Sequence, residues 1–304
     1  MPIVKHIEWQ SSPTAHVFLP KDSAGHLIFS ERFFADYWAE KPLLSPKSHA
    51  VLDPWNVTLE CLEVNVMQNA AYVFVGGKSI SFNFTLKPNQ SFQYSLSDLG
   101  IPADSKVVYV NYTPNSGGLF PAEMTGNVAN TRRRFDPVTV VGGPLGKNTI
   151  PEDTEVCGML TYLPPFTDVV DFQLAEAAEH FSHEQHENCL IPSHTAFEIS
   201  LSRLIDLYLA PRVEKASAKN FSRIAFEHKL KVMLPLIAQS TKAKLLDGKI
   251  LAALHELQRE RNRVAHTGKM TKKLTSKEAA RMLAGALFGV SYTRHLEARL
   301  QLTP

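Results

Sequence analysis

The chain has little cysteine, and its hydrophobic residues do not form long runs. Its three cysteines, Cys61, Cys157 and Cys189, are an odd and widely spaced set, which argues against a disulfide framework and against a zinc ribbon. No apolar run approaches the roughly 18 residues that a membrane-spanning helix needs. The N-terminus, MPIVKHIEWQ, lacks the basic-then-apolar shape of a secretory signal. We therefore expect a cytosolic protein without a membrane partner.

A strong charge of one sign is also missing, since the net charge is only +2. Residues 167–304 hold 20 Lys and Arg against 15 Asp and Glu, whereas residues 1–166 hold 12 against 15. A basic half favours a polyanionic partner, although this excess is too small to establish one. Hydrophobic residues make up 44% and charged residues 20% of the chain, which is typical of soluble globular proteins long enough for two domains.

Residues 57–163 are predicted to form short strands. Five segments alternate or run apolar with β-branched and aromatic residues, and turn signals such as KPNQ and TPNSGG separate them. The segments are VTLECLEVNV, AYVFVGG, SISFNFTL, SFQYSL and KVVYVNYT. Short strands without intervening helices are typical of an antiparallel sandwich or barrel. We therefore expect residues 1–166 to form a β-rich, sandwich- or barrel-like domain, with one helix in SERFFADYWAE capped by Ser30.

Residues 167–304 are predicted to form an all-α bundle, which makes the fold class α+β with two domains. The Pro-rich YLPPF marks the boundary, and after it apolar residues recur at helical spacing. Five helices are predicted. The first covers about 168–188, and the second restarts the helix at Pro192. The third and fourth cover about 220–238 and 245–266, and the fifth begins at the capping box TSKE.

The stretch ELQRERNRVAHTGK, residues 256–269, holds the candidate catalytic residues. Arg261 is followed by Asn262, and His266 comes five positions after Arg261, near the predicted end of a helix closed by Gly268. At a helix end the backbone can bend the ring of His266 back toward Arg261. A fixed guanidinium beside an imidazole suits phosphodiester chemistry without metal, because one binds phosphate and the other exchanges protons near neutral pH.

The spacing alone decides nothing, because Arg223 and His228 are also five residues apart. That pair is predicted to lie early in a helix, where side chains five residues apart point about 140° away from each other. The asparagine next to Arg261 and the helix end near His266 distinguish the second pair from the first.

Residues of about 168–300 resemble a HEPN domain, a helical family with many metal-independent endoribonucleases. The hallmark of the family is an arginine, then a polar residue that is often asparagine, then a histidine four to six residues after the arginine, and RNRVAH fits it at Arg261, Asn262 and His266. The segment IPSHTAFEISLSRLI is similar to the second helix of the family, where an acidic residue like Glu198 often recurs. FEHKLKVMLPLI is similar to the third helix, and HTGKMTKKLTSKEAARML to the continuation after the motif.

This resemblance implies a homodimer in which the two motifs face one cleft. His266 would assist attack of the ribose 2′-hydroxyl or protonate the leaving oxygen, Arg261 would stabilise the phosphorane, and Asn262 would orient a phosphate oxygen. The need for a 2′-hydroxyl would restrict cleavage to RNA. The expected function is an endoribonuclease of the toxin or antiviral-defence type, in which the β-rich domain senses a trigger, binds an inhibitor or selects the substrate.

Other basic residues are weaker candidates for contacts with RNA. They are Arg263, Lys269, Arg132, Arg133 and Arg134, the last three in TRRRFD, where Phe135 could stack on a base. We interpret HFSHEQHE as a solvated polar face, because histidines three residues apart rotate around a helix and cannot converge on a metal. VGGPLGKNT has the wrong spacing for a phosphate loop. We therefore expect neither a metal nor another cofactor.

An alternative stays open, in which the helical bundle only dimerises or scaffolds and the β-rich domain binds a partner. The two hypotheses differ at His266, which an endoribonuclease needs and an adaptor does not. An ion pair of Arg261 with Glu256 or Glu260 on its own helix would favour the adaptor, because it would occupy the guanidinium.

Overall fold

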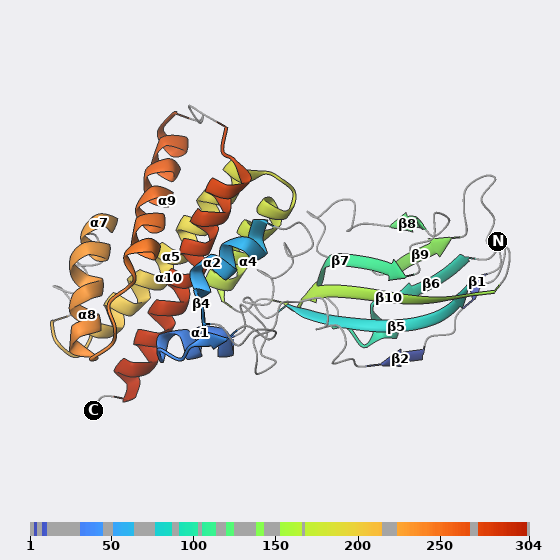
Figure 1. The fold of residues 1–304 in the computed structure, drawn as a ribbon, viewed down its shortest axis with the longest axis horizontal. Helices are drawn as coiled ribbons and strands as arrows, with labels where there is room; N and C mark the ends of the chain where they lie inside the picture. The colour runs from blue at the N-terminus through green and yellow to red at the C-terminus, as the bar shows by residue number, and fades with distance from the viewer. Residues whose placement is uncertain are drawn as a thin grey trace. The chain divides into compact units, whose positions relative to one another are not determined.

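The computed structural model describes residues 3–4, 8–10, 31–44, 51–63, 77–86, 91–102, 105–113, 120–124, 138–142, 153–165, 168–214, 224–267 and 273–302. The chain divides into two compact units, whose elements are labelled in Figure 1. Residues 1–20 and 76–167 form the first unit, and residues 21–75 and 168–304 form the second. The change from strands to helices falls between residues 167 and 168, but a segment from the N-terminal half also belongs to the helical unit.

The described part of the first unit contains two four-stranded sheets. One has the order β2-β5-β10-β7 and is antiparallel throughout, with strands Glu8–Gln10, Lys78–Leu86, Thr154–Leu163 and Lys106–Thr113. The other has the order β1-β6-β9-β8, with strands Ile3–Val4, Ser91–Ser95, Val138–Gly142 and Phe120–Met124, of which β1 and β6 are parallel. A short 3-10 turn, η3 (Ser97–Leu99), follows β6.

Three of the five predicted strands are confirmed. SISFNFTL, SFQYSL and KVVYVNYT correspond to β5, β6 and β7. In β5 the alternation works as expected, because Phe82 and Phe84 are buried and stack on each other while Asn83 between them is exposed. AYVFVGG lies outside the described residues, apart from its last glycine.

The prediction of a sandwich- or barrel-like domain over residues 1–166 is wrong. Most described residues lie in helices, and in the described ranges the strands form open sheets without a closed barrel or a sandwich. The third sheet has only two strands, β3 (Leu43–Leu44) and β4 (Val51–Leu52). Both strands belong to the segment 21–75, which is part of the helical unit.

VTLECLEVNV, predicted as a strand, contains most of helix α2 (Pro54–Glu63). Its β-branched residues suggest a strand, but the segment before it carries helix-start signals. The carboxylate of Asp53 accepts the backbone N–H of Trp55 at 3.0 Å, and Pro54 occupies the first helical position, where it needs no hydrogen-bond donor. Trp55, Thr58 and Leu62 then form one buried helical face.

The helical unit also contains α1 (Glu31–Trp38), which confirms the helix predicted in SERFFADYWAE, whereas Ser30 lies outside the described residues. The later elements are α4 (Val169–Ser182), α5 (His186–Leu209), α7 (Phe226–His228), the π-helical turn η4 (Lys229–Met233), α8 (Leu234–Ser240), α9 (Gly248–Thr267) and α10 (Ser276–Leu302). The capping box is confirmed at the start of α10: Thr275 Oγ1 accepts the backbone N–H of Glu278 at 3.2 Å, and the Glu278 carboxylate accepts that of Thr275 at 2.9 Å.

The predicted helix restart at Pro192 is wrong, because α5 runs through this residue to Leu209. The chain instead breaks between α4 and α5, where Glu184 has a left-handed φ of 58°. A proline inside a helix removes one backbone hydrogen bond. Pro192 is buried, as are Leu190 and Phe197 of the same helix.

Helix α10 is the central element of this unit, and Figure 1 shows it among the other helices. Two glycines allow it to approach its neighbours closely. A Cβ at Gly289 would lie 2.8 Å from the ring of Phe197 on α5, and one at Gly285 would lie 2.9 Å from the Cβ of Ala253 on α9. Helices α5 and α9 are therefore fixed against α10 and against each other, which places the candidate residues that they carry. No helix in the described ranges is long and apolar enough to span a membrane.

Candidate functional site

Arg261 continues the inward face of α9. Along this helix Ile250, Leu254 and Leu257 are fully buried, and Arg261 follows four residues later, half-buried. Its Nη1 donates a hydrogen bond of 3.1 Å to Oδ1 of Asn262. The structure therefore brings together the first two residues of the predicted motif, and the amide of Asn262 holds the guanidinium at the helix surface.

The acidic residues around Arg261 are engaged elsewhere. Glu256 and Glu260 form ion pairs with three other arginines, namely Arg259, Arg263 and Arg281. The pair between Arg263 and Glu260 is the best defined, with a distance of 2.7 Å between Nη1 and Oε2. Among the ion pairs of the described residues, none involves Arg261. Its charge is therefore not neutralised by a carboxylate on its own helix.

His266 does not meet Arg261 within one chain. Helix α9 continues through Thr267, so His266 lies in a regular last turn and is exposed. Side chains five residues apart on such a helix point about 140° away from each other, which is the divergence predicted for the pair Arg223 and His228. The expectation that the backbone bends the His266 ring back is wrong for the single chain, because the helix extends past this residue.

Glu198 lies on α5, and next to it is a residue that the sequence analysis missed. Its Oε2 is 3.5 Å from Nδ1 of His194, one helical turn earlier. His194 is only 2% exposed, and its ring centroid is 4.7 Å from that of Phe226 on α7. In the part of the chain that the structure describes, neither of its ring nitrogens has a hydrogen-bond partner. Burial, and then the charge of Arg261, lower its pKa to about 4, so the imidazole is neutral at physiological pH. A signal was present, since histidine and glutamate four residues apart share a helix face.

The exposed carboxylate of Glu198 does not offset the effects that lower the pKa of His194. Its side chain is 39% exposed and therefore well solvated, which weakens its field on the imidazole. The structure thus brings Glu198, His194, Arg261 and Asn262 together where α5 meets α9. This group combines a cation, a neutral imidazole, an amide and a solvated carboxylate, and such a set can bind an anion and orient it.

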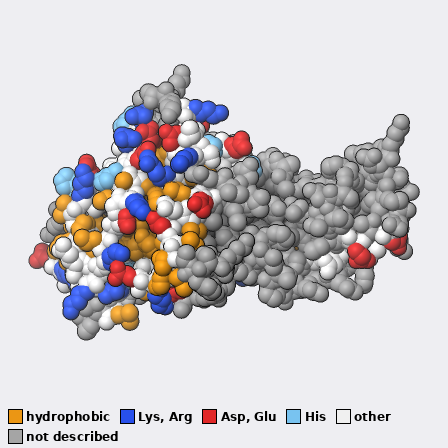
Figure 2. Space-filling model, viewed as in Figure 1, with side chains coloured by type: hydrophobic (Ala, Val, Ile, Leu, Met, Phe, Trp, Pro, Cys, Tyr) orange, Lys and Arg blue, Asp and Glu red, His pale blue; other side chains and the backbone are white. Residues whose placement is uncertain are grey.

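Of the other predicted residues, Arg263 is held by Glu260, as described above. Arg132, Arg133, Arg134, Lys269 and the Gly268 cap lie outside the described residues, as does the glycine-rich segment after β9. Figure 2 shows basic side chains interspersed with acidic ones over the end of the helical unit at which α9 finishes.

The histidines of HFSHEQHE are used in local contacts. Nδ1 of His180 is 2.9 Å from Oε1 of Gln185, and Nδ1 of His183 is 2.8 Å from the backbone oxygen of Glu179. The ring of His186 lies against Phe181, with centroids 5.6 Å apart. In the described ranges no three His, Cys, Asp or Glu residues are arranged to hold a metal ion.

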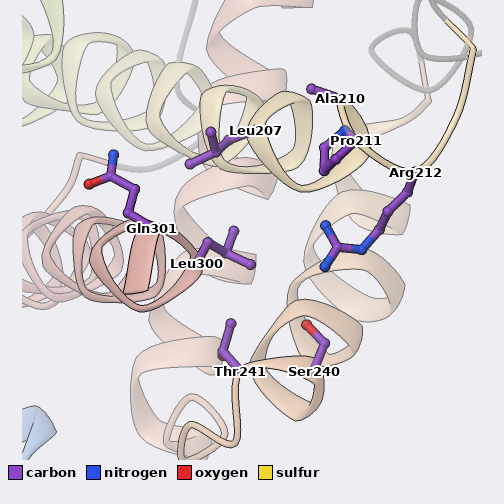
Figure 3. Close-up of a pocket in the computed structure, with 8 residues that line it drawn as sticks. All are labelled: Leu207, Ala210, Pro211, Arg212, Ser240, Thr241, Leu300 and Gln301. Carbon is purple, nitrogen blue, oxygen red and sulfur yellow. The ribbon is translucent and has the colours of Figure 1, made fainter. Parts of the chain in front are cut away.

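A cavity of about 700 Å³ lies where α5, α8 and α10 end (Figure 3). Its lining mixes apolar residues such as Leu207 and Leu300 with Arg212 and Ser240. Nη1 of Arg212 already donates to the backbone oxygen of Tyr208 at 2.7 Å, and the Ser240 hydroxyl donates to a backbone oxygen of α8. Leu207 is roughly 20 Å along α5 from His194, so this cavity is separate from the group around Arg261.

Comparison of the chain with protein-family models, with curated proteins and with solved structures finds no match. The resemblance to HEPN domains, and the roles that it implies for Arg261, Asn262 and His266, therefore stay predictions.

Proposed function

We propose that this protein is a metal-independent endoribonuclease of the toxin or antiviral-defence type that acts as a homodimer. The observation that supports the proposal most is that, among the described residues, no carboxylate pairs with the guanidinium of Arg261. Two glutamates on its own helix pair with other arginines, and within the described ranges the guanidinium is hydrogen-bonded to the amide of Asn262 alone. An arginine without a carboxylate partner can bind a phosphate without first breaking an ion pair.

In the proposed reaction the ribose 2′-oxygen attacks the adjacent phosphorus and the bond from phosphorus to the 5′-oxygen breaks. The 2′-hydroxyl proton leaves to a base and the 5′-oxygen receives a proton, so the products carry a 2′,3′-cyclic phosphate and a 5′-hydroxyl. His266 serves one of these two proton transfers. Arg261 stabilises the charge on the pentavalent phosphorus, and Asn262 orients a phosphate oxygen.

A homodimer supplies what the single chain lacks. Arg261 and His266 of one chain diverge around α9, so a cleft that contains both needs His266 from a second copy. A symmetric dimer would place two such arginine–histidine pairs in the one shared cleft, because a two-fold interface repeats every contact. The unit formed by residues 1–20 and 76–167 would then restrain the enzyme by binding an inhibitor or a trigger, since an unregulated ribonuclease damages its own cell.

The first test is cleavage of labelled single-stranded RNA and matching DNA in EDTA by wild type, Arg261→Gln and His266→Ala. His228→Ala is a matched control, because His228 is an exposed helical histidine in an arginine–histidine pair of the same spacing. We expect RNA cleavage with cyclic phosphate ends by wild type and the control, and loss of cleavage in the other two variants. Equal activity in all four would indicate another site or a contaminant.

Mixing the two inactive variants tests the shared site. In a heterodimer of Arg261→Gln with His266→Ala, one arginine–histidine pair of the shared cleft would have both residues intact and the other pair neither. Random pairing would then restore about a quarter of the wild-type activity per chain. No restoration in verified heterodimers would contradict a site shared between subunits.

The second candidate function is an adaptor that uses the bundle only for assembly. The divergence of Arg261 and His266 within the chain favours it. Verified wild-type dimers that bind RNA no better than DNA and cleave neither would support the adaptor and contradict the endoribonuclease.

A further inference from the structure

His194 is buried among groups that leave its polar atoms unsatisfied. It lies on α5, with Glu198 one turn later on the same helix, Arg261 across on α9, and the ring of Phe226 packed against it. Neither ring nitrogen has a hydrogen-bond partner among the described residues, and Nδ1 is 3.5 Å from Oε2 of Glu198. Buried polar atoms without partners are uncommon in proteins and destabilise them, so such a residue needs a reason.

Packing alone does not provide this reason. The neighbours Ala196, Phe197 and Leu201 on α5 are completely buried and apolar, and Phe226 presents an aromatic ring. A phenylalanine at position 194 would fill a similar volume in these surroundings without burying two polar atoms. The histidine therefore offers something that an apolar ring lacks, namely one hydrogen-bond donor and one acceptor in the neutral form.

We propose that His194 is a positioning residue for Arg261, which it connects to the carboxylate of Glu198. In the complex with RNA, Nδ1–H of His194 donates to Glu198, and Nε2 accepts a hydrogen bond from the guanidinium as Arg261 turns from Asn262 toward a phosphate. This role rests on the proposed function and assigns no proton transfer to His194.

Two observations fit this arrangement. The separation of 3.5 Å between Nδ1 and the carboxylate is just too long for a good hydrogen bond, and such bonds often tighten only when substrate binds. The imidazole is neutral, so its second nitrogen can accept from a cation, which a protonated ring could not do. The aligned guanidinium would then present its remaining N–H groups to the phosphate.

Two charged groups act on the ring of His194 among the described residues, namely Glu198 on the same helix and Arg261 on α9. On α7, Glu227 and His228 are exposed to solvent. Lys229 lies on η4, and its Nζ donates to the hydroxyl of Ser202 at 3.0 Å. Ser202 comes after His194 and Glu198 on α5. Phe226 on α7 carries no charge.

The test compares His194→Phe, which removes the polar atoms at similar volume, with His194→Gln, which keeps a donor and an acceptor. Folding and dimerisation of both would be checked first. We expect His194→Phe to lower kcat for RNA cleavage by about ten- to a hundredfold, as misplacement of a catalytic group does. His194→Gln should stay within about threefold of wild type, since it can orient Arg261. A phenylalanine variant as active as wild type, or a glutamine variant as impaired as phenylalanine, would overturn the proposal.

A second readout does not depend on activity. The imidazole C2–H resonance of His194 would be followed by NMR against pH in an otherwise wild-type protein and in Arg261→Gln. The midpoint should rise when Arg261 is removed, and Arg259→Gln on the same helix serves as the control that should leave it unchanged. An unchanged midpoint in Arg261→Gln would show that the two side chains do not interact and would refute the inference. A raised midpoint in a protein that cleaves no RNA would uphold the electrostatic interaction but refute both the proposed function and the role of His194 in it.

Discussion

Replacing Phe288 by alanine should lower the stability of the helical unit by weakening the packing of α1 and α2 on α10. Phe288 lies on α10 and is completely buried. Five aromatic rings of the segment 31–55 surround it, with centroid distances of 6.5 Å to Phe33, 5.1 Å to Phe34, 5.2 Å to Tyr37, 6.3 Å to Trp38 and 5.5 Å to Trp55. The phenyl ring is thus one of the contacts through which a distant part of the sequence packs on α10, beside those of Trp38 with Ser291 and Tyr292.

The expected loss of stability is large. Truncation of a buried phenylalanine to alanine destabilises a protein by about 3–5 kcal/mol, because the cavity adds to the lost transfer free energy. Edge-to-face aromatic pairs contribute about 0.5–1.5 kcal/mol each beyond their buried area, although not additively. With five rings around Phe288, we expect the upper part of this range, about 4–5 kcal/mol. For a unit of this size the midpoint of thermal unfolding should fall by about 8–20 °C.

The assay is urea unfolding at pH 7 and 25 °C, followed by tryptophan fluorescence. Trp38 and Trp55 both lie beside Phe288, and Trp9 lies on β2 in the other unit. Trp9→Phe in all proteins would make the signal report the helical unit alone. Leu302→Ala is the control on the same helix, since Leu302 is 83% exposed and should change stability by less than about 0.5 kcal/mol.

A loss below about 1 kcal/mol in Phe288→Ala would contradict the packing of residues 31–55 on α10. An equal loss in Phe288→Ala and Leu302→Ala would do the same. Either result would mean that the helical unit is stable without the N-terminal helices.

Three further predictions concern single side chains. The pKa of His194 is about 4 in the folded protein against 6.5 for an ordinary histidine, so between these pH values only the unfolded chain binds the proton, and stability falls with falling pH. Wild type should lose about 3 kcal/mol more than His194→Gln between pH 7 and pH 4 in urea titrations, and parallel curves would refute this. Thr275→Ala should cost about 1 kcal/mol because it removes the capping box of α10, and an unchanged unfolding midpoint would contradict the cap. Cys189 is buried, and burial raises the pKa of its thiol to about 12. In a variant whose other two cysteines are replaced by serine, Cys189 should therefore react with a thiol reagent at pH 8 only as the protein unfolds. Complete labelling of the native protein within minutes would disprove this.

The sequence by itself determined the elements whose signals are local. The capping box forms because Thr275 and Glu278 lie within one turn, and the alternation of phenylalanine with polar residues in β5 has the period of a strand at any location. Arg261 and Asn262 could be paired from sequence because they are adjacent on one helix. His194 escaped notice because its lack of partners depends on Phe226 and Arg261, which are far away in the chain.

Tertiary structure decided the rest. The run of β-branched residues after Trp55 suits a strand as well as a helix, and packing of Trp55, Thr58 and Leu62 stabilises the helix. Pro192 lies inside α5, although its sequence signal is that of a helix start, and its own side chain is buried. The indole of Trp38 donates a hydrogen bond of 2.7 Å to the hydroxyl of Ser291, 253 residues later. The periodicity of apolar residues indicates which face of a segment is buried. It does not indicate which distant surface covers that face, because the choice of surface depends on the complementary shapes of the folded elements.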